Sequence, residues 1–131
     1  MSRSGYTEDY SDQWDWIRWR GAVKSAIRGA RGQAFLKELL YALDHLPKLS
    51  LIVGELERGG EVCALGAVGR HRGLDMEGLD PEDFFTTATA FDIPCALAQE
   101  IMYINDEEGL RTEPGWARFN RVREWVRQQI K

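Results

Sequence analysis

The sequence predicts a mainly α fold: a single compact domain of about five helices, in which a short β-hairpin at 51–68 is one of two open interpretations. Apolar residues recur every three or four positions in several segments, as they do along helices that bury one face. Helix-start and helix-stop residues separate these segments. A chain of 131 residues with 44% hydrophobic content matches one domain with its own core rather than a disordered chain.

Residues 1–11 are polar and are predicted to be a flexible N-terminal segment, while residues 12–131 are predicted to form the single globular domain. The N-terminus lacks the hydrophobic core of a signal peptide, and no apolar run approaches the ~18 residues that span a bilayer. We therefore expect a cytoplasmic protein with no membrane partner. Cys63 and Cys95 lie in apolar segments without metal-ligand spacing, which favours buried thiols over a disulfide or a metal site.

A first helix is expected to begin after Ser11 or Asp12, either of which can cap it, and to continue toward residue 31. Its apolar residues fall in one broad arc when successive residues are placed ~100° apart. Its cations form a separate arc about 80° wide, the basic wedge, which consists of Arg20, Lys24, Arg28 and Arg31. Like charges at this spacing repel by a few tenths of a kcal/mol per pair. We expect compensation from the acidic middle of the chain, from a phosphate-bearing ligand or from an acidic partner.

Proline and glycine residues divide the rest of the chain into elements. Residues 51–68 allow two interpretations. Gly59-Gly60 has the form of a hairpin turn, whereas Leu51–Arg58 also suits a helix and Cys63–Val68 a buried helix of small residues. The other expected elements are a helix from Gln33 to Leu46, a loop at 70–79, and helices from Asp80 to Ala90, from Ile93-Pro94 to Asn105 and from Pro114 or Trp116 to the end. The last helix is expected to bury Trp116, Phe119, Val122, Val126 and Ile130.

The stretch from Gly60 to Gly73 is rich in small residues and ends on three potential cations, Arg70, His71 and Arg72. Glycine and alanine at this density suit close packing of two backbones, so we interpret the apolar half as core. The cationic exit is a functional candidate only if it meets the basic wedge. The resulting candidate binding residues are Arg20, Lys24, Arg28, Arg31, Arg70, His71 and Arg72.

The net charge of −4 is unevenly distributed along the chain. Residues 16–31 hold five basic residues and no acid, residues 54–108 hold thirteen acids and three basic residues, and residues 109–131 hold six basic residues and two acids. Two interpretations are open. The charges neutralise each other within the molecule, or one face binds an anion or an acidic partner.

Catalytic, metal-binding and DNA-binding interpretations are disfavoured. A nucleophilic site from Cys63, His71 and Asp106 would need an accessible sulfur, yet Cys63 lies in an apolar run. Two histidines far apart do not suggest a metal or a cofactor. Residues 88–101 imitate a helix-turn-helix, but residues 94–104 contain no Lys or Arg to meet phosphates, so duplex DNA binding is not expected. Asn105 and Asp106 are interpreted as a structural clamp, with a polar ligand contact as the alternative.

Several segments carry a resemblance to known groups. The Trp19–Val23 and Ile27–Gln33 segments resemble small uncharacterised proteins of phages and prophages in proteobacteria, over most of the chain. The second half is also similar to a bacterial domain family of unknown function with a Cys-Ala-Leu-Gly-Ala, Asn-Asp and Arg-Thr pattern, here at Cys63–Ala67, Asn105-Asp106 and Arg111-Thr112. This chain departs from that family because no aromatic residue precedes Cys63.

The resemblance implies the origin of the protein, a small accessory gene of a mobile element, and no catalytic residues. Such proteins usually bind a host component, often to block a defence system. We therefore expect a non-enzymatic protein in the bacterial cytoplasm that binds and inhibits a host defence protein. The five tryptophans suit a binding role because tryptophan dominates binding hot spots. The alternative is that it sequesters a phosphate-bearing nucleotide in a cationic pocket. The sequence leaves open whether it forms oligomers.

Overall fold

The computed structural model describes residues 3–4, 13–109 and 112–131, with only the backbone described for residue 13. The expectation of a mainly α fold is confirmed, with a hairpin within 51–68. In order, the elements are α1 (Gln13–Arg28), α2 (Ala30–Asp44), β1 (Glu57–Arg58), β2 (Glu61–Val62), α3 (Ala64–Arg72), α4 (Phe84–Phe91), α5 (Cys95–Asp106) and α6 (Gly115–Gln129). None of the described helices is long and apolar enough to cross a membrane.

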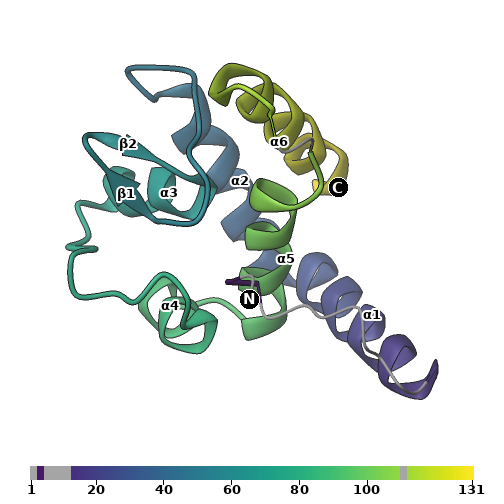
Figure 1. The fold of residues 1–131 in the computed structure, drawn as a ribbon. Helices are drawn as coiled ribbons and strands as arrows, with labels where there is room; N and C mark the ends of the chain where they lie inside the picture. The colour runs from purple at the N-terminus through teal and green to yellow at the C-terminus, as the bar shows by residue number, and fades with distance from the viewer. Residues whose placement is uncertain (1–2, 5–12, 110–111) are drawn as a thin grey trace.

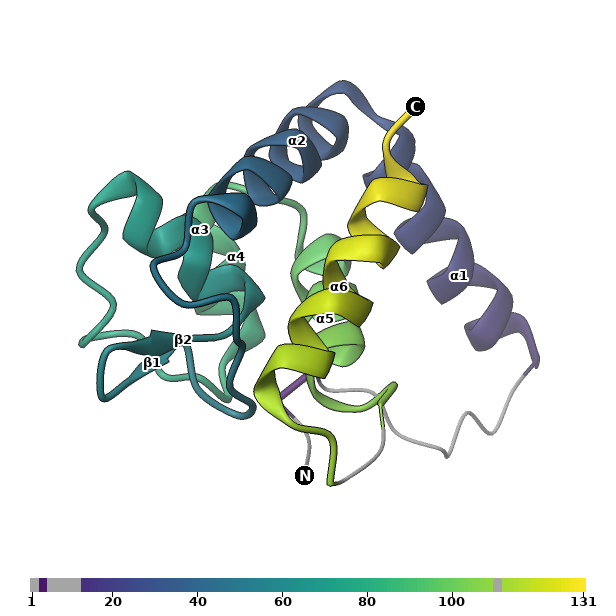
Figure 2. The ribbon, with the colours of Figure 1, turned by 90° about the horizontal axis from the view of Figure 1, so that it is seen from above.

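Helix α2 organises the core. It packs against α3 and α6, and α5 contacts α1, α3, α4 and α6 (Figure 1). Helix α1 packs mainly against α2 and α5, and its first turns extend away from this assembly (Figures 1 and 2). Most of the largest fully buried side chains come from α2, α3, α4 and α5, with Leu51 from the loop after α2; they include Leu36, Leu39, Leu43, Leu51, Leu65, Phe91, Leu97 and Ile101.

The hairpin interpretation of 51–68 is confirmed at 57–62 and the helical one from Ala64 onward, whereas the alternative of a helix over Leu51–Arg58 is wrong. Strands β1 and β2 pair in antiparallel fashion through a turn at Gly59 and Gly60, whose φ angles are 59° and 84°. A type I′ turn needs positive φ at both central residues, which glycine adopts without steric cost. Helix α3 follows directly and extends through Arg72. The loop that was expected at 70–79 therefore begins later than predicted, after Arg72. The helix ends where Gly73 adopts φ 69°.

The boundary between the first two helices lies earlier in the chain than expected. Helix α1 ends at Arg28, and α2 begins at Ala30 after Gly29, which has an extended backbone. The two helices approach each other closely at Gly32, where a Cβ atom would lie 1.7 Å from the Ala26 carbonyl oxygen. The absence of a side chain at this position allows the close approach. Arg31 therefore lies on a different helix from the rest of the basic wedge. The predicted capping residues Ser11 and Asp12 fall outside the described residues.

Two further expectations are wrong, one about where α4 begins and one about the burial of Trp116. Helix α4 begins at Phe84 rather than near Asp80, because Asp83 is the residue whose carboxylate accepts the Thr86 N–H, at 3.0 Å. Trp116, expected in the core, is 64% exposed. At this end of α6 the buried position belongs to Arg118, whose guanidinium donates to the Leu51 carbonyl at 2.8 Å.

Candidate functional site

Two cations of the basic wedge pair with acids of the central part of the chain. The Arg20 guanidinium lies 3.2 Å from the buried Glu100 carboxylate on α5 and 4.7 Å from the centre of the Trp19 ring. Arg31 donates to the backbone carbonyl and to the carboxylate of Asp92, each at 2.9 Å. For these two residues, the compensation that the sequence calls for comes from within the molecule.

The other two wedge cations differ. Within the described part of the chain, the Lys24 and Arg28 side chains have no hydrogen bond or ion pair, and both residues are exposed. They share one side of α1 with two large apolar side chains, Trp14 (65% exposed) and Ile17 (49% exposed). All residues of this side are exposed and recur every three or four positions. We call it the outer face of α1: Trp14, Ile17, Arg18, Gly21, Lys24, Ser25 and Arg28.

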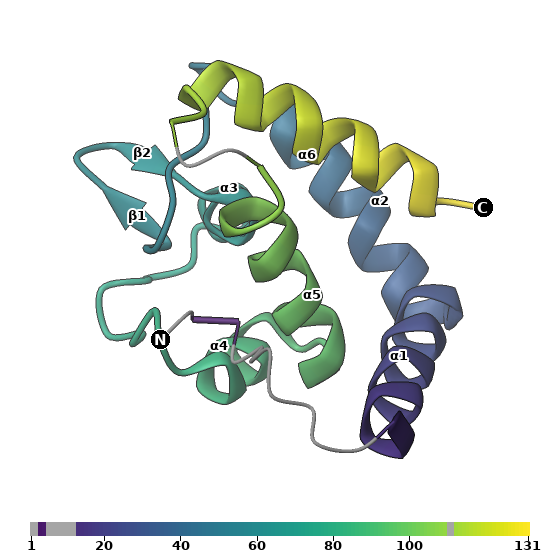
Figure 3. The same cartoon turned by 45° about the vertical axis from the view of Figure 1, so that its right-hand side comes forward.

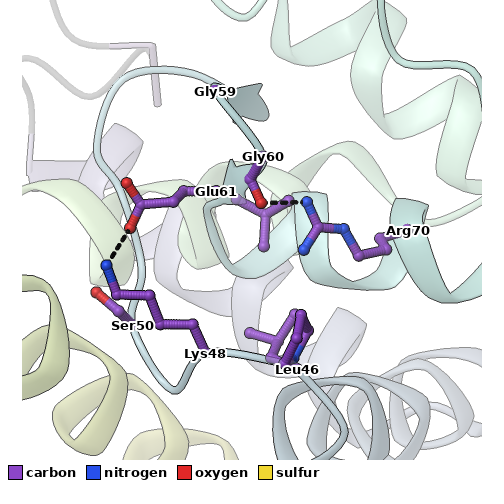
Figure 4. A pocket seen from close by; sticks show the side chains of 9 residues that line it. Leu46, Lys48, Ser50, Gly59, Gly60, Glu61 and Arg70 are labelled. Carbon is purple, nitrogen blue, oxygen red and sulfur yellow. Dashed lines mark hydrogen bonds and ion pairs between the residues drawn. The ribbon is translucent and has the colours of Figure 1, made fainter.

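The cationic exit of α3 begins at Arg70, which lines a pocket of about 310 Å³ beside the hairpin turn (Figure 4). Arg70 donates to the Gly60 carbonyl at 2.5 Å and lies 3.6 Å from the Glu57 carboxylate. On the opposite wall, Lys48 lies 3.3 Å from Glu61 (Figure 4). Each cation of this pocket thus has a neighbouring carboxylate, so its walls are close to neutral.

Arg72 brings the cationic exit and the basic wedge together. Its guanidinium donates to both carboxylate oxygens of Glu38, at 2.8 and 2.6 Å, and to the Phe91 carbonyl at 2.9 Å. The hydrogen bond from Arg72 holds the pKa of Glu38 below its ordinary value. Arg72 and Arg31, from two helices, line one cavity of about 220 Å³ that Phe35, Glu38 and Asp92 also line. The basic wedge and the cationic exit therefore meet at this cavity, through Arg31 and Arg72.

His71 does not join this cavity. Its ring lies 5.2 Å from the exposed Tyr41 ring, which stacks on His45 at 3.9 Å. Cys63 lies at the other end of α3, eight residues or about 12 Å away along a helix axis. Asp106 lies near Cys63, at the opposite end of α3 from His71. The three side chains of the disfavoured nucleophilic site are therefore not assembled.

Asn105 ties three segments together at that end. Its side-chain oxygen accepts the Ala64 N–H at 3.0 Å, and its amide donates to the Ile52 carbonyl at 2.9 Å and to Asp106 at 2.8 Å. These contacts join the end of α5 to the start of α3 and to the loop before β1. A buried side chain with all of these partners acts as a clamp on the core.

Arg3 belongs to the same cluster, which no sequence pattern indicates. Its side chain is buried and bonds to both carboxylate oxygens of Asp106, at 2.5 and 2.9 Å, and to the Cys63 sulfur at 3.5 Å. Burial alone lowers the pKa of Arg3, but Cys63 and Asp106 outweigh it and raise the pKa above its ordinary value. Arg3 and Ser4, both in the segment expected to be flexible, are buried.

Cys63 itself has a structural environment. Its sulfur accepts the Gly66 N–H at 3.4 Å and so caps α3, and the residue is fully buried. Reaction with a substrate would require access to the sulfur, which Arg3 covers.

The described residues contain no group of three or more His, Cys, Asp or Glu side chains that could hold a metal ion. Comparisons with protein-family models, with curated proteins and with solved structures found no match. The partner and the chemistry must therefore be argued from the surfaces of the molecule.

Proposed function

We propose that this protein acts by binding another protein, as an accessory protein of a phage or prophage that binds and inhibits a host defence protein. The observation that carries this proposal is the outer face of α1. There, two large apolar side chains are about half exposed or more, beside cations that have little or no internal compensation.

Such a face suits binding for two physical reasons. Exposed tryptophan is the residue type that most often dominates interface energies, and an exposed apolar cluster costs free energy until a partner covers it. Cations around the cluster accelerate association with an acidic surface and select against basic ones. Since the first turns of α1 extend beyond the core (Figure 2), a large partner can reach them.

The host component of the proposal rests on the resemblance to phage and prophage proteins. The fold adds that the nucleophilic site of Cys63, His71 and Asp106 is not assembled, since Cys63 is covered and His71 lies at the far end of α3. An inhibitor that occupies a partner surface needs no such chemistry.

The test combines capture with phage growth. The tagged protein, the Trp14→Ala/Ile17→Ala variant and a Trp116→Ala control are incubated with host lysate. Trp116 is as exposed as Trp14 but lies on α6. We expect a specific protein to be captured by the wild type and the control, and at least about tenfold less by the α1 variant, because hot-spot side chains contribute about 2 kcal/mol or more. The plating efficiency of a phage that carries the α1 variant should fall in parallel on a host that has the defence system. Equal capture or equal plating for all three proteins would contradict the proposal.

A second candidate function is favoured by the cavity between Arg31 and Arg72, which could receive a phosphate group. The phosphate would have to displace Asp92 and Glu38 from the two arginines. A thermal-shift screen with linear and cyclic nucleotides tests this. A ligand at 100 times its Kd should stabilise the wild type by about 2.7 kcal/mol, and the Arg72→Gln variant much less. If no nucleotide shifts the unfolding temperature, this candidate is discarded.

A further inference from the structure

A third cavity is lined by apolar and acidic side chains. It measures about 240 Å³ and lies between the strand β1 and the loop from α3 to α4. Pockets for drug-sized ligands measure about 300–1,000 Å³, so this cavity suits a single large side chain. We call it the acidic pocket: Leu56, Met76, Leu79 and Pro81 with Glu55, Glu57 and Glu77.

The acidic pocket has an excess of negative charge. Glu55 lies 3.2 Å from Arg58 and Glu57 lies 3.6 Å from Arg70. The Glu77 carboxylate has no cation within ion-pair distance among the residues that the structure describes. Residues 75–83 contain five acids and no basic residue. The pocket therefore attracts a cation or a cationic segment.

The outer face of α1 has the complementary properties. Trp14 and Ile17 supply apolar side chains, and Arg18, Lys24 and Arg28 supply positive charge along the same side of the helix. Arg18 is 77% exposed in its side chain, and its only carboxylate neighbour in the described chain is Asp15 at 3.9 Å. The apolar side chains of this face suit the apolar lining of the acidic pocket, and its cations are opposite in charge to the acidic lining.

The two surfaces cannot meet within one molecule. Strand β1 and the loop after α3 lie at one end of the fold, and α1 lies at the opposite end in all three ribbon views (Figures 1–3). They can meet between two molecules. We propose that two copies of this chain associate head to tail, with the outer face of α1 of one copy in the acidic pocket of the next.

This geometry sets the behaviour of the assembly. The contact is heterologous, so each added copy leaves one α1 face and one acidic pocket available for another copy. One helix face in one small pocket is a small interface, in the class of weak and transient contacts. Since opposite charges contribute to it, salt weakens it. The inference does not require the proposed host partner, although both would use the outer face of α1.

Light scattering and sedimentation of the full chain test the inference. The average mass should rise with protein concentration at low salt and return toward that of the monomer at high salt. Glu77→Arg should reduce the association constant at least tenfold, as should Trp14→Ala/Ile17→Ala, whereas the exposed control Trp116→Ala should not. Each variant changes exposed side chains, so the unfolding temperature should stay that of the wild type.

A mixing experiment identifies the head-to-tail arrangement. The Glu77→Arg variant retains its α1 face, and the Trp14→Ala/Ile17→Ala variant retains its acidic pocket. Each alone should be monomeric, whereas their mixture should form one-to-one dimers that do not grow further. A wild type that stays monomeric at all concentrations overturns the inference, as does association that both variants leave unchanged. Host capture by the Glu77→Arg variant would separate the two proposals, because it needs only the α1 face.

Discussion

Replacing Gly66 with alanine is expected to destabilise the protein by about 3 kcal/mol, at the upper end of what overpacking of a core costs. Helix α3 approaches the loop before β1 so closely that a Cβ atom at this position would lie 1.9 Å from the Leu56 carbonyl oxygen. That carbonyl accepts the Cys63 N–H at 3.1 Å. Relief of the clash would therefore move backbone and lengthen a hydrogen bond at the start of the helix.

The matched controls are two glycines with open surroundings. A Cβ atom at Gly78 would have no neighbour within 4 Å, and the φ of this residue is not positive, so Gly78→Ala should change the unfolding free energy by less than about 0.5 kcal/mol. Gly21 lies exposed within α1, where alanine should stabilise by about 0.5–1 kcal/mol. Urea unfolding measures all three. A Gly66→Ala protein as stable as Gly78→Ala would refute the close approach of α3.

Replacing Arg3 with alanine is expected to cost about 3–5 kcal/mol, the typical cost of removing one partner of a buried ion pair. The Asp106 carboxylate, only 12% exposed, would lose two hydrogen bonds, and the Cys63 sulfur would lose its neighbouring charge. Arg3→Lys should be intermediate, because lysine keeps the charge but cannot bond to both carboxylate oxygens in the same planar geometry.

The control for Arg3 is Arg18→Ala, which removes an arginine whose side chain is 77% exposed. Its unfolding free energy should differ from that of the wild type by less than about 0.5 kcal/mol. Thiol labelling provides a second measurement, since Cys63 should react faster with a thiol reagent when Arg3 no longer covers it. If Arg3→Ala and Arg18→Ala have the same stability and the same labelling rate, then Arg3 is not part of the core.

The elements that the sequence predicts well are those with local signals. The apolar repeat of α2 acts within a few residues, so the sequence predicts this helix directly. The Gly59-Gly60 pair is also a local signal, and it offered the hairpin turn as one of two open interpretations. The errors arise where two distant segments compete. Trp116 has the spacing of a core residue, yet Arg118 takes the buried place because the Leu51 carbonyl, 67 residues earlier, accepts a hydrogen bond from its guanidinium.

The candidate site divides in the same way. The sequence by itself determined a mainly α class, the separation of basic and acidic segments, and the presence of cations on the first helix. Only the tertiary structure decided which cations are paired: Arg20 with Glu100, 80 residues away, Arg3 with Asp106, 103 residues away, and neither Lys24 nor Arg28 with any acid in the described chain. The physical reason is that ion pairs form through space after helices pack, whereas periodicity reports only which side of a helix a residue occupies.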